Sequence, residues 1–218
     1  MPTRRHPLIA REGWAHVAVA VGVAGLVHVW AGAVWALPLW LGVAFVVQFF
    51  RDPPRRIPAQ AGAAVAPADG KVVALGPAED PYLKRPAQRV SIFMNVFSVH
   101  SNRMPVAGEV VQRWYHAGRF FNAALDKAST ENERNAVWIK TVDGEDVVSV
   151  QVAGLIARRI LCYVSAGDQV ERGERYGFIR FGSRVDVYLP EQAVIRVHLG
   201  KWVSAGESVI ATLAATAR

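Results

Sequence analysis

The chain has 218 residues, a formal net charge of +7 and one cysteine, Cys162. This length suits one sizeable domain with an additional segment, and a single cysteine excludes an internal disulfide. The basic excess is concentrated in residues 1–60, and no basic block with interleaved aromatic residues occurs, so nucleic acid is not an expected partner. The CxxC and HExxH spacings are absent, and no metal is expected. Cys162 lies in an apolar run and is interpreted as a small buried side chain.

The first predicted element is a membrane segment. No charged residue occurs from Gly13 to Phe50, a run of 38 residues, whereas one spanning helix needs about 20. Two short helices joined near Ala31 and Gly32 fit this length, and residues 1–50 are therefore predicted to form a transmembrane helical hairpin. Two alternatives stay open, namely a buried hairpin of a soluble protein and a shallow re-entrant hairpin. Both ends are expected in the cytoplasm because arginines flank the run on both sides: Arg4, Arg5, Arg11, Arg51, Arg55 and Arg56.

Residues 51–62, "RDPPRRIPAQAG", are predicted to be a Pro/Arg-rich linker. Residues 63–218 form the expected β-rich domain, with runs of Val, Ile, Tyr and Phe between turn signals. Only residues 122–134 suggest a loop or a short helical turn. The predicted strands cover 71–75, 89–96, 108–116, 135–142, 146–154, 158–164, 177–189 and 193–199.

A repeated sequence pattern suggests the architecture of this domain. The pattern G-x-x-V-x-x-G begins at Gly167 and again at Gly200. It resembles the hairpins of biotinyl/lipoyl domains, with glycines in turns and the valine in the core. The fold class is therefore predicted to be mainly β, with a barrel-sandwich catalytic domain behind the membrane hairpin.

The stretch "YGFIRFGSRVDVYLP", residues 176–190, contains one unexpected residue. Read as a single strand, its odd positions from Ile179 to Leu189 are apolar except for Ser183, which follows Gly182. Two other positions are candidates for chemistry. Asp69 lies in a P-x-D-G turn, where an aspartate is more often only a turn residue. His100 ends an apolar run, where a lone histidine is more often a core or edge residue.

Four segments in order resemble one enzyme family. "PADGKV", "FSVHSNRMPVAGEV", "NAALDKASTENERNA" and "FGSRVDVYLP" are similar to the short form of phosphatidylserine decarboxylase, over about Asp69 to Leu213. The resemblance implies that Ser183 Oγ attacks the carbonyl carbon of Gly182. An ester forms, elimination leaves dehydroalanine, and loss of ammonia leaves a pyruvoyl group. The products would be a large chain, residues 1–182, and a small chain, residues 183–218, associated as a heterodimer.

The resemblance also implies the reaction and the roles of site residues. The pyruvoyl group derived from Ser183 would form a Schiff base with the amine of phosphatidylserine and accept the electrons released with CO2, with no external cofactor. Phosphatidylethanolamine would be the product. Asp69 and His100 match the positions that polarise Ser183 for cleavage, and His100 would act again as an acid or base. The family's longer members carry a second histidine where this chain has Arg103. Which group then completes the relay stays open, and Arg103 is a candidate to hold the substrate's phosphate or carboxylate instead.

Some matching residues have no assigned role. Asn132, Glu133 and Arg134 belong to the "ENER" run, where a structural loop and a substrate contact are both open, and His116 is interpreted as structural or at the rim of the site. The alternative function is a non-enzymatic, membrane-anchored lipoyl-like carrier or adaptor, modified at Lys127. The order of the motifs argues against this alternative. In lipoyl domains the G-x-x-V-x-x-G pattern precedes the modified lysine, whereas here it follows Lys127. The expected location is the cell membrane with the catalytic domain on the cytoplasmic side, and a higher oligomer stays open.

Overall fold

The computed structural model describes residues 7–123, 128–155, 159–180 and 182–214. The chain divides into two compact units, Met1–Pro54 and Arg55–Arg218. The predicted linker of residues 51–62 does not coincide with this division, because the residues from Arg55 onward belong to the second unit.

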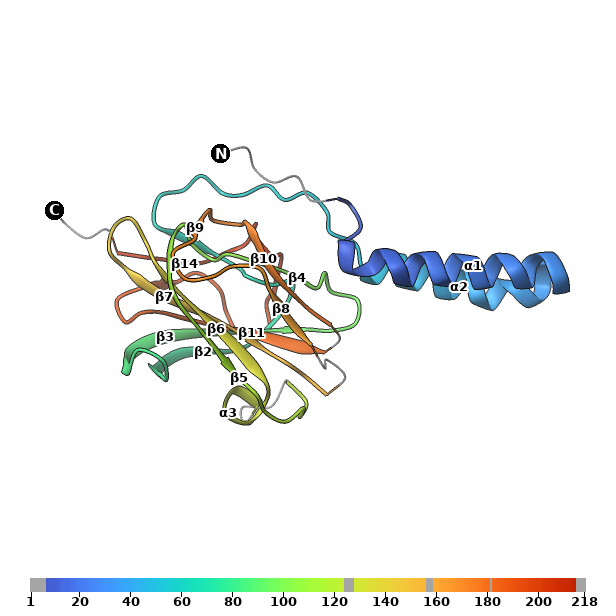
Figure 1. Ribbon diagram of the computed structural model, residues 1–218. Helices are drawn as coiled ribbons and strands as arrows, with labels where there is room; N and C mark the ends of the chain where they lie inside the picture. Colours follow the sequence, from blue (N-terminus) through green and yellow to red (C-terminus); the bar gives the residue numbers. More distant parts are fainter. Residues whose placement is uncertain (1–6, 124–127, 156–158, 181, 215–218) are drawn as a thin grey trace. The chain divides into compact units, whose positions relative to one another are not determined.

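The first unit is a pair of apolar helices. A 3-10 turn, η1 (Arg11–Gly13), leads into α1 (Trp14–Ala31), and Gly32 connects it to α2 (Ala33–Phe49), which lies beside α1 (Figure 1). Gly32 has a φ of 87°, a left-handed conformation that glycine adopts at little cost. Large apolar side chains remain exposed near this turn, with Trp30 at 85% and Trp35 at 72%. Within the described residues, Arg11–Ala31 is long and apolar enough to cross a membrane, and α2 is shorter.

The second unit is mainly β, as predicted (Figure 1). Residues 122–134 contain the one-turn helix α3 (Ala128–Glu131), and the predicted strand at 193–199 is reduced to β12. The strands are β1 (Ala63–Val65), β2 (Gly70–Asp80), β3 (Arg85–Met94), β4 (Ser101–Arg103), β5 (Gly108–His116), β6 (Arg134–Lys140), β7 (Asp146–Val152), β8 (Ile160–Cys162), β9 (Gln169–Val170), β10 (Arg175–Ile179), β11 (Ser183–Pro190), β12 (Val194–Ile195), β13 (Trp202–Val203) and β14 (Val209–Thr212).

A curled eight-stranded sheet dominates this unit, in the order β13-β2-β3-β11-β7-β6-β5-β9 (Figure 1). Two three-stranded sheets, β1-β14-β12 and β4-β10-β8, accompany it. Every strand pair is antiparallel. The sheet curls into a half-barrel, so the β-rich prediction is confirmed, while the barrel-sandwich arrangement stays a prediction.

The two copies of the G-x-x-V-x-x-G pattern provide the two edges of the large sheet. β9 pairs with β5 and β13 pairs with β2, and the pattern's valines, Val170 and Val203, are buried in the core. The first glycines of both copies, Gly167 and Gly200, have φ values of 89° and 85°. These local features agree with the roles that the pattern predicts for glycine and valine.

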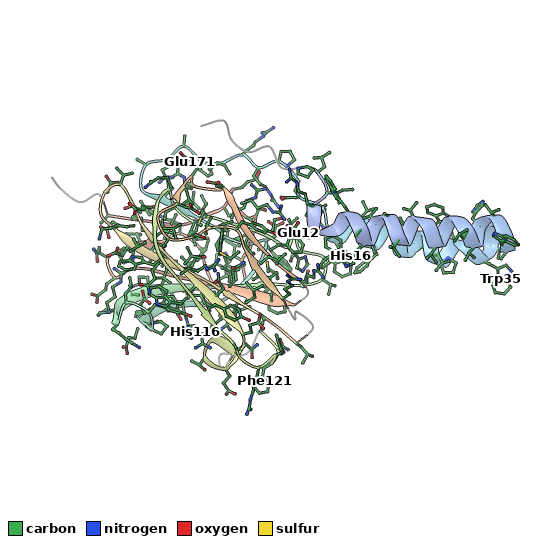
Figure 2. All side chains as sticks on the ribbon, viewed as in Figure 1. Glu12, His16, Trp35, His116, Phe121 and Glu171 are labelled. Carbon is green, nitrogen blue, oxygen red and sulfur yellow. The ribbon has the colours of Figure 1, made fainter. Side chains whose placement is uncertain are left out.

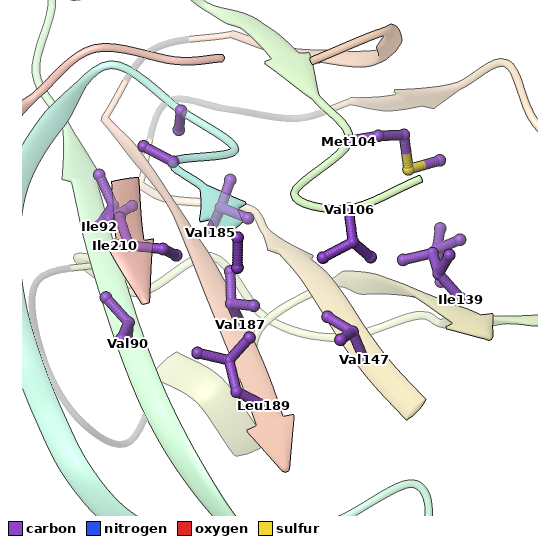
Figure 3. Packing of buried hydrophobic residues seen from close by; sticks show 14 of the residues in the cluster. Val90, Ile92, Met104, Val106, Ile139, Val147, Val185, Val187, Leu189 and Ile210 are labelled. Carbon is purple, nitrogen blue, oxygen red and sulfur yellow. The ribbon is translucent and has the colours of Figure 1, made fainter. Parts of the chain in front are cut away.

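The main core lies on one face of β11. Val185, Val187 and Leu189 point toward side chains of β3, β7 and β14, among them Val90, Ile92, Val147 and Ile210 (Figure 3). All of these side chains are at most 1% exposed. Fully burying one such side chain stabilises a fold by about 1.5–3 kcal/mol, so β11 is held firmly in the sheet.

The other face of β11 is buried as well. Its alternating positions carry Arg184, Asp186 and Tyr188, which are 5% exposed or less. Arg184 and Asp186 form an ion pair in which Nε lies 2.9 Å from Oδ1. A buried pair of this kind is costly to break because the remaining charge loses its partner. The polar residues of this strand therefore form a second packed layer, together with Ala87, Ala128, Ala136, Val148, Val150 and Val152.

Candidate active site

The prediction of a single strand over residues 177–189 is wrong. The chain forms β10 in one three-stranded sheet and then β11 in the centre of the large sheet, and it bends at Gly182. Gly182 has a φ of 60°, and a Cβ placed on it would meet nothing within 4 Å. Glycine is therefore required here by backbone conformation, since a left-handed conformation costs other residues about 1–2 kcal/mol.

Ser183 is the first residue of β11 and is completely buried. It pairs with Met94 at the end of β3. Among the residues that the structure describes, its Oγ has no hydrogen-bond partner. An unsatisfied buried hydroxyl costs about 1–3 kcal/mol, and among the described residues the buried Ser91 and Ser101 carry the same cost. Ser183 differs from these two serines in its place directly after Gly182, whose φ is positive.

His100 lies close to the turn that precedes Ser183. Its side chain is fully buried, its backbone oxygen accepts a hydrogen bond from Ile179 at 3.2 Å, and its ring centroid lies 6.3 Å from that of Phe178. Both of these contact residues belong to β10. The structure therefore brings His100 to the β10–β11 connection, although His100 and Ser183 are far apart in the sequence.

A buried amide chain, which the sequence analysis missed, fixes the strand that follows His100. Asn102 Nδ2 donates to Met94 Sδ at 3.7 Å, and its Oδ1 accepts from Gln151 Nε2 at 2.8 Å. Gln151 Oε1 in turn accepts from Asn135 Nδ2 at 3.0 Å. These contacts tie β4 to β3, β7 and β6 beside the residue that pairs with Ser183. The available signal was Gln151 in the middle of the valine-rich stretch "VVSVQVAG".

Asp69 lies at the same end of the sheet but has other partners. It precedes β2, which is separated from β11 by β3, so two strand spacings, roughly 10 Å, separate it from Ser183. Its carboxylate accepts from Arg55 Nη2 at 2.9 Å through both oxygens and from the backbone N–H of Ala205 at 2.7 Å. No hydrogen bond joins Asp69 to His100 among the described residues, so the predicted relay between them stays a prediction.

Arg55 is an unexpected member of this site. It comes from the predicted linker, its side chain is 7% exposed, and it also lies 3.7 Å from Glu207 Oε2. Asp69 belongs to the predicted large chain, whereas Ala205 and Glu207 belong to the predicted small chain. The Arg55–Asp69 pair therefore joins the start of the second unit to both parts of the predicted cleaved protein.

Replacing Arg55 is expected to weaken the second unit. Arg55→Ala leaves the Asp69 carboxylate without its charged partner, and hydrogen bonds to charged groups contribute about 1.5–3 kcal/mol. We expect the free energy of unfolding to fall by about that amount, measured by denaturant titration in detergent. Arg56→Ala is the matched control, because the residue is exposed and binds Glu207 only through its backbone N–H. Equal stability of the two variants would contradict the role of Arg55.

Arg103 lies in the interior, at 8% exposed. Its Nη1 donates to the carbonyl oxygen of Gly173 at 3.1 Å, and its Cδ lies 3.0 Å from where a Cβ on Gly206 would be. The structure thus gives Arg103 a structural hydrogen bond, and its predicted contact with substrate remains a prediction.

The "ENER" run is structural at two of its positions. Asn132 is fully buried and bonds three backbone groups, those being the N–H and the oxygen of Phe121 and the oxygen of Ala153. Arg134 Nη1 donates to the carbonyl of Thr130 at 2.8 Å. His116, labelled in Figure 2, has its ring centroid 5.9 Å from that of Tyr82. Burial first, and the charge of Arg134 second, lower the pKa of His116, which favours its neutral form.

The comparison with protein families decides the assignment. A family model described as phosphatidylserine decarboxylase matches residues 43–211. The chain belongs to the phosphatidylserine decarboxylase family. The match contains Asp69, His100, Gly182 and Ser183, so every candidate catalytic position of this family member falls within it.

Full-length relatives support the same assignment. The chain is 64% identical to the phosphatidylserine decarboxylase proenzyme of Aromatoleum aromaticum, over 95% of this chain and 97% of the relative. It is 60% identical to the proenzyme of Nitrosomonas europaea, over 96% and 97% of the two chains. It is also 60% identical to the proenzyme of Burkholderia pseudomallei, over 95% and 96%.

Proposed function

We propose that this protein converts phosphatidylserine to phosphatidylethanolamine, using a pyruvoyl group made from its own Ser183. The observation that carries the proposal is the near full-length similarity to proteins named phosphatidylserine decarboxylase proenzyme. The local structure supports it, since the Gly182–Ser183 peptide lies at a left-handed turn and the hydroxyl is buried beside the scissile bond.

Maturation in this proposal begins with the Ser183 hydroxyl. Its Oγ bonds to the carbonyl carbon of Gly182 as the Gly182–Ser183 C–N bond breaks, which gives an ester. Removal of the Ser183 α-proton then expels the Gly182 carboxylate and leaves dehydroalanine at residue 183. Water replaces the nitrogen as ammonia, and the pyruvoyl carbonyl remains. His100 is the proposed base, because neutral imidazole accepts a proton near pH 7.

The surroundings of Ser183 fit a group that reacts with an amine. Ser183 is fully buried and pairs with Met94 of β3. Once formed at residue 183, the pyruvoyl group would supply a carbonyl for the substrate amine and a sink for the electron pair released with CO2. His100 then returns a proton to the substrate carbon, and the apolar surroundings disfavour the substrate carboxylate relative to neutral CO2.

The two products of self-cleavage would remain associated. Ser183–Pro190 pairs with β3 on one side and Arg184–Tyr188 pairs with β7 on the other. Asp69 and Ala205 also form a hydrogen bond across the proposed large and small chains. These contacts support a heterodimer of residues 1–182 and 183–218.

The helical hairpin supports a membrane location. α1 has 18 residues, or about 27 Å at 1.5 Å per residue, which approaches the roughly 30 Å thickness of the bilayer core. Exposed apolar side chains, including Trp30 and Trp35, suit lipid contact. In this proposal the hairpin anchors the protein in the cell membrane, with the catalytic unit on the cytoplasmic side where the substrate head group is accessible.

The carrier alternative is less well supported. Lys127, its modification site, lies outside the described residues, and the family assignment favours an enzyme. The two functions predict different covalent forms. The enzyme gives two chains, whereas the carrier gives one chain with a lipoyl adduct on Lys127.

Intact mass measurement of the purified full-length protein tests the proposal. We expect two chains separated between residues 182 and 183, with no free α-amine on the smaller one. CO2 should be released from vesicles that contain phosphatidylserine and not from vesicles of phosphatidylcholine, which lacks both the primary amine and the carboxylate. A single chain without CO2 release would contradict the proposed function.

A further inference from the structure

Gly154 lies directly against the bond that is proposed to break. It follows β7 by two residues, and a Cβ placed on it would overlap the carbonyl oxygen of Gly182. The same Cβ would also lie 3.4 Å from that of Ala123. Gly154 does not have a positive φ. Its lack of a side chain is therefore required by the close approach of the Gly182 carbonyl and not by its own backbone conformation.

Ala153, the residue before Gly154, forms hydrogen bonds through both its backbone N–H and its backbone carbonyl. The N–H of Ala153 donates to the oxygen of Glu133 at 2.9 Å, and its carbonyl accepts from Asn132 Nδ2 at 2.7 Å. Asn132 also bonds the N–H and the oxygen of Phe121, at 2.9 Å and 2.8 Å. The Asn132 amide thereby joins three segments, and it fixes where Gly154 meets Gly182.

The proposed acyl shift depends on the position of this carbonyl. Ser183 Oγ must approach the Gly182 carbonyl carbon, and the oxygen acquires negative charge as the bond forms. The oxygen of Gly182 faces Gly154, so a small movement of Gly154 would rotate or displace the reacting group.

We propose that Gly154, held in place by Asn132, is a positioning residue that orients the Gly182 carbonyl for attack by Ser183. This inference rests on the proposed self-cleavage. It assigns to the "ENER" run an indirect part in maturation, through the Ala153–Gly154 backbone and not through contact with substrate.

The test is the rate of chain splitting in full-length Gly154→Ala. A misplacement of about 1 Å can cost on the order of 100-fold in rate, and we expect a loss of that size. Hydroxylamine, which cleaves esters, should not speed the splitting of the variant, because formation of the ester is itself the slowed step. If the variant were blocked after the acyl shift, hydroxylamine would cut the ester between residues 182 and 183. That result would overturn the inference.

Gly108→Ala is the matched control. A Cβ on Gly108 would overlap the carbonyl oxygen of Lys140. This is a comparable steric conflict, but it lies at the last residue of β6, whereas Asn132 precedes the first residue of that strand. We expect lower thermal stability in both variants but normal splitting in Gly108→Ala. Equal slowing in the two variants, or normal splitting of Gly154→Ala, would overturn the inference.

Asn132→Ala provides a second test that leaves Gly154 unchanged. It removes the bonds to Phe121 and Ala153, and we expect slower splitting than in the unmodified protein, again without a hydroxylamine-sensitive ester. Normal splitting of a folded Asn132→Ala would remove Asn132 from the inference. Failure of the unmodified protein to split would instead contradict the proposed function, so the two failures can be distinguished.

Discussion

Ser183→Ala is expected to yield one chain of 23.8 kDa with no decarboxylase activity. The alanine keeps the Cβ of the buried strand residue but removes the Oγ that would attack the Gly182 carbonyl. Without the ester, neither elimination nor formation of the pyruvoyl group can follow. Intact mass and a denaturing gel measure splitting, and CO2 release from phosphatidylserine vesicles measures activity.

Ser91→Ala is the matched control for this change. Ser91 is also completely buried, lies on the neighbouring strand β3, and its Oγ has no hydrogen-bond partner among the described residues. The control should split and decarboxylate normally, because it removes a similar hydroxyl from a position opposite Asp186 and not from the scissile peptide. If Ser183→Ala still splits after residue 182, the self-cleavage mechanism is wrong.

His100→Ala is expected to block chain splitting, whereas Arg103→Ala is expected to permit it. Neutral imidazole can accept the proton of Ser183, but an arginine side chain stays protonated in proteins and cannot. Arg103→Ala should instead lose its hydrogen bond to Gly173, at a cost of about 1.5–3 kcal/mol in stability. A time course on a denaturing gel measures splitting, and CO2 release measures the turnover of whatever has matured.

His116→Ala is the control for the loss of an imidazole. His116 is half-buried on β5 beside Tyr82, and we expect this variant to mature normally. The opposite pattern, with Arg103→Ala uncleaved and His100→Ala split at the normal rate, would reverse the assigned roles. The proton transfer would then have to be assigned to another group.

Asp69 shows what the tertiary structure adds to a prediction about the site. The sequence places it before β2, and the resemblance pairs it with His100. In the structure its carboxylate binds Arg55 and the backbone of Ala205. A shortened chain that begins at Ala61 would lack Arg55, so the structure places the start of the catalytic unit earlier than the predicted linker did.

Local sequence was sufficient where the physical cause is local. An uncharged run of 38 residues predicts apolar helices, and periodic Val, Ile and Tyr predict strands whatever their partners are. The glycines and valines of G-x-x-V-x-x-G predict turns and core contacts, which the structure confirms at both edges of the sheet. The Gly182–Ser183 pair was also conspicuous by itself, as a hydroxyl among apolar residues.

Only the tertiary structure decided what surrounds that pair. Alternation of residues cannot reveal that the chain turns at Gly182, because the same pattern continues through β10 and β11 although they belong to different sheets. It also cannot reveal that both faces of β11 are buried, since burial of Arg184 and Asp186 depends on segments distant in sequence. The Asn132 bonds to Phe121 and Ala153, and the contact of Gly154 with Gly182, are likewise set by packing between distant segments. Steric exclusion and hydrogen bonding act between neighbours in space, and a single sequence records only neighbours along the chain.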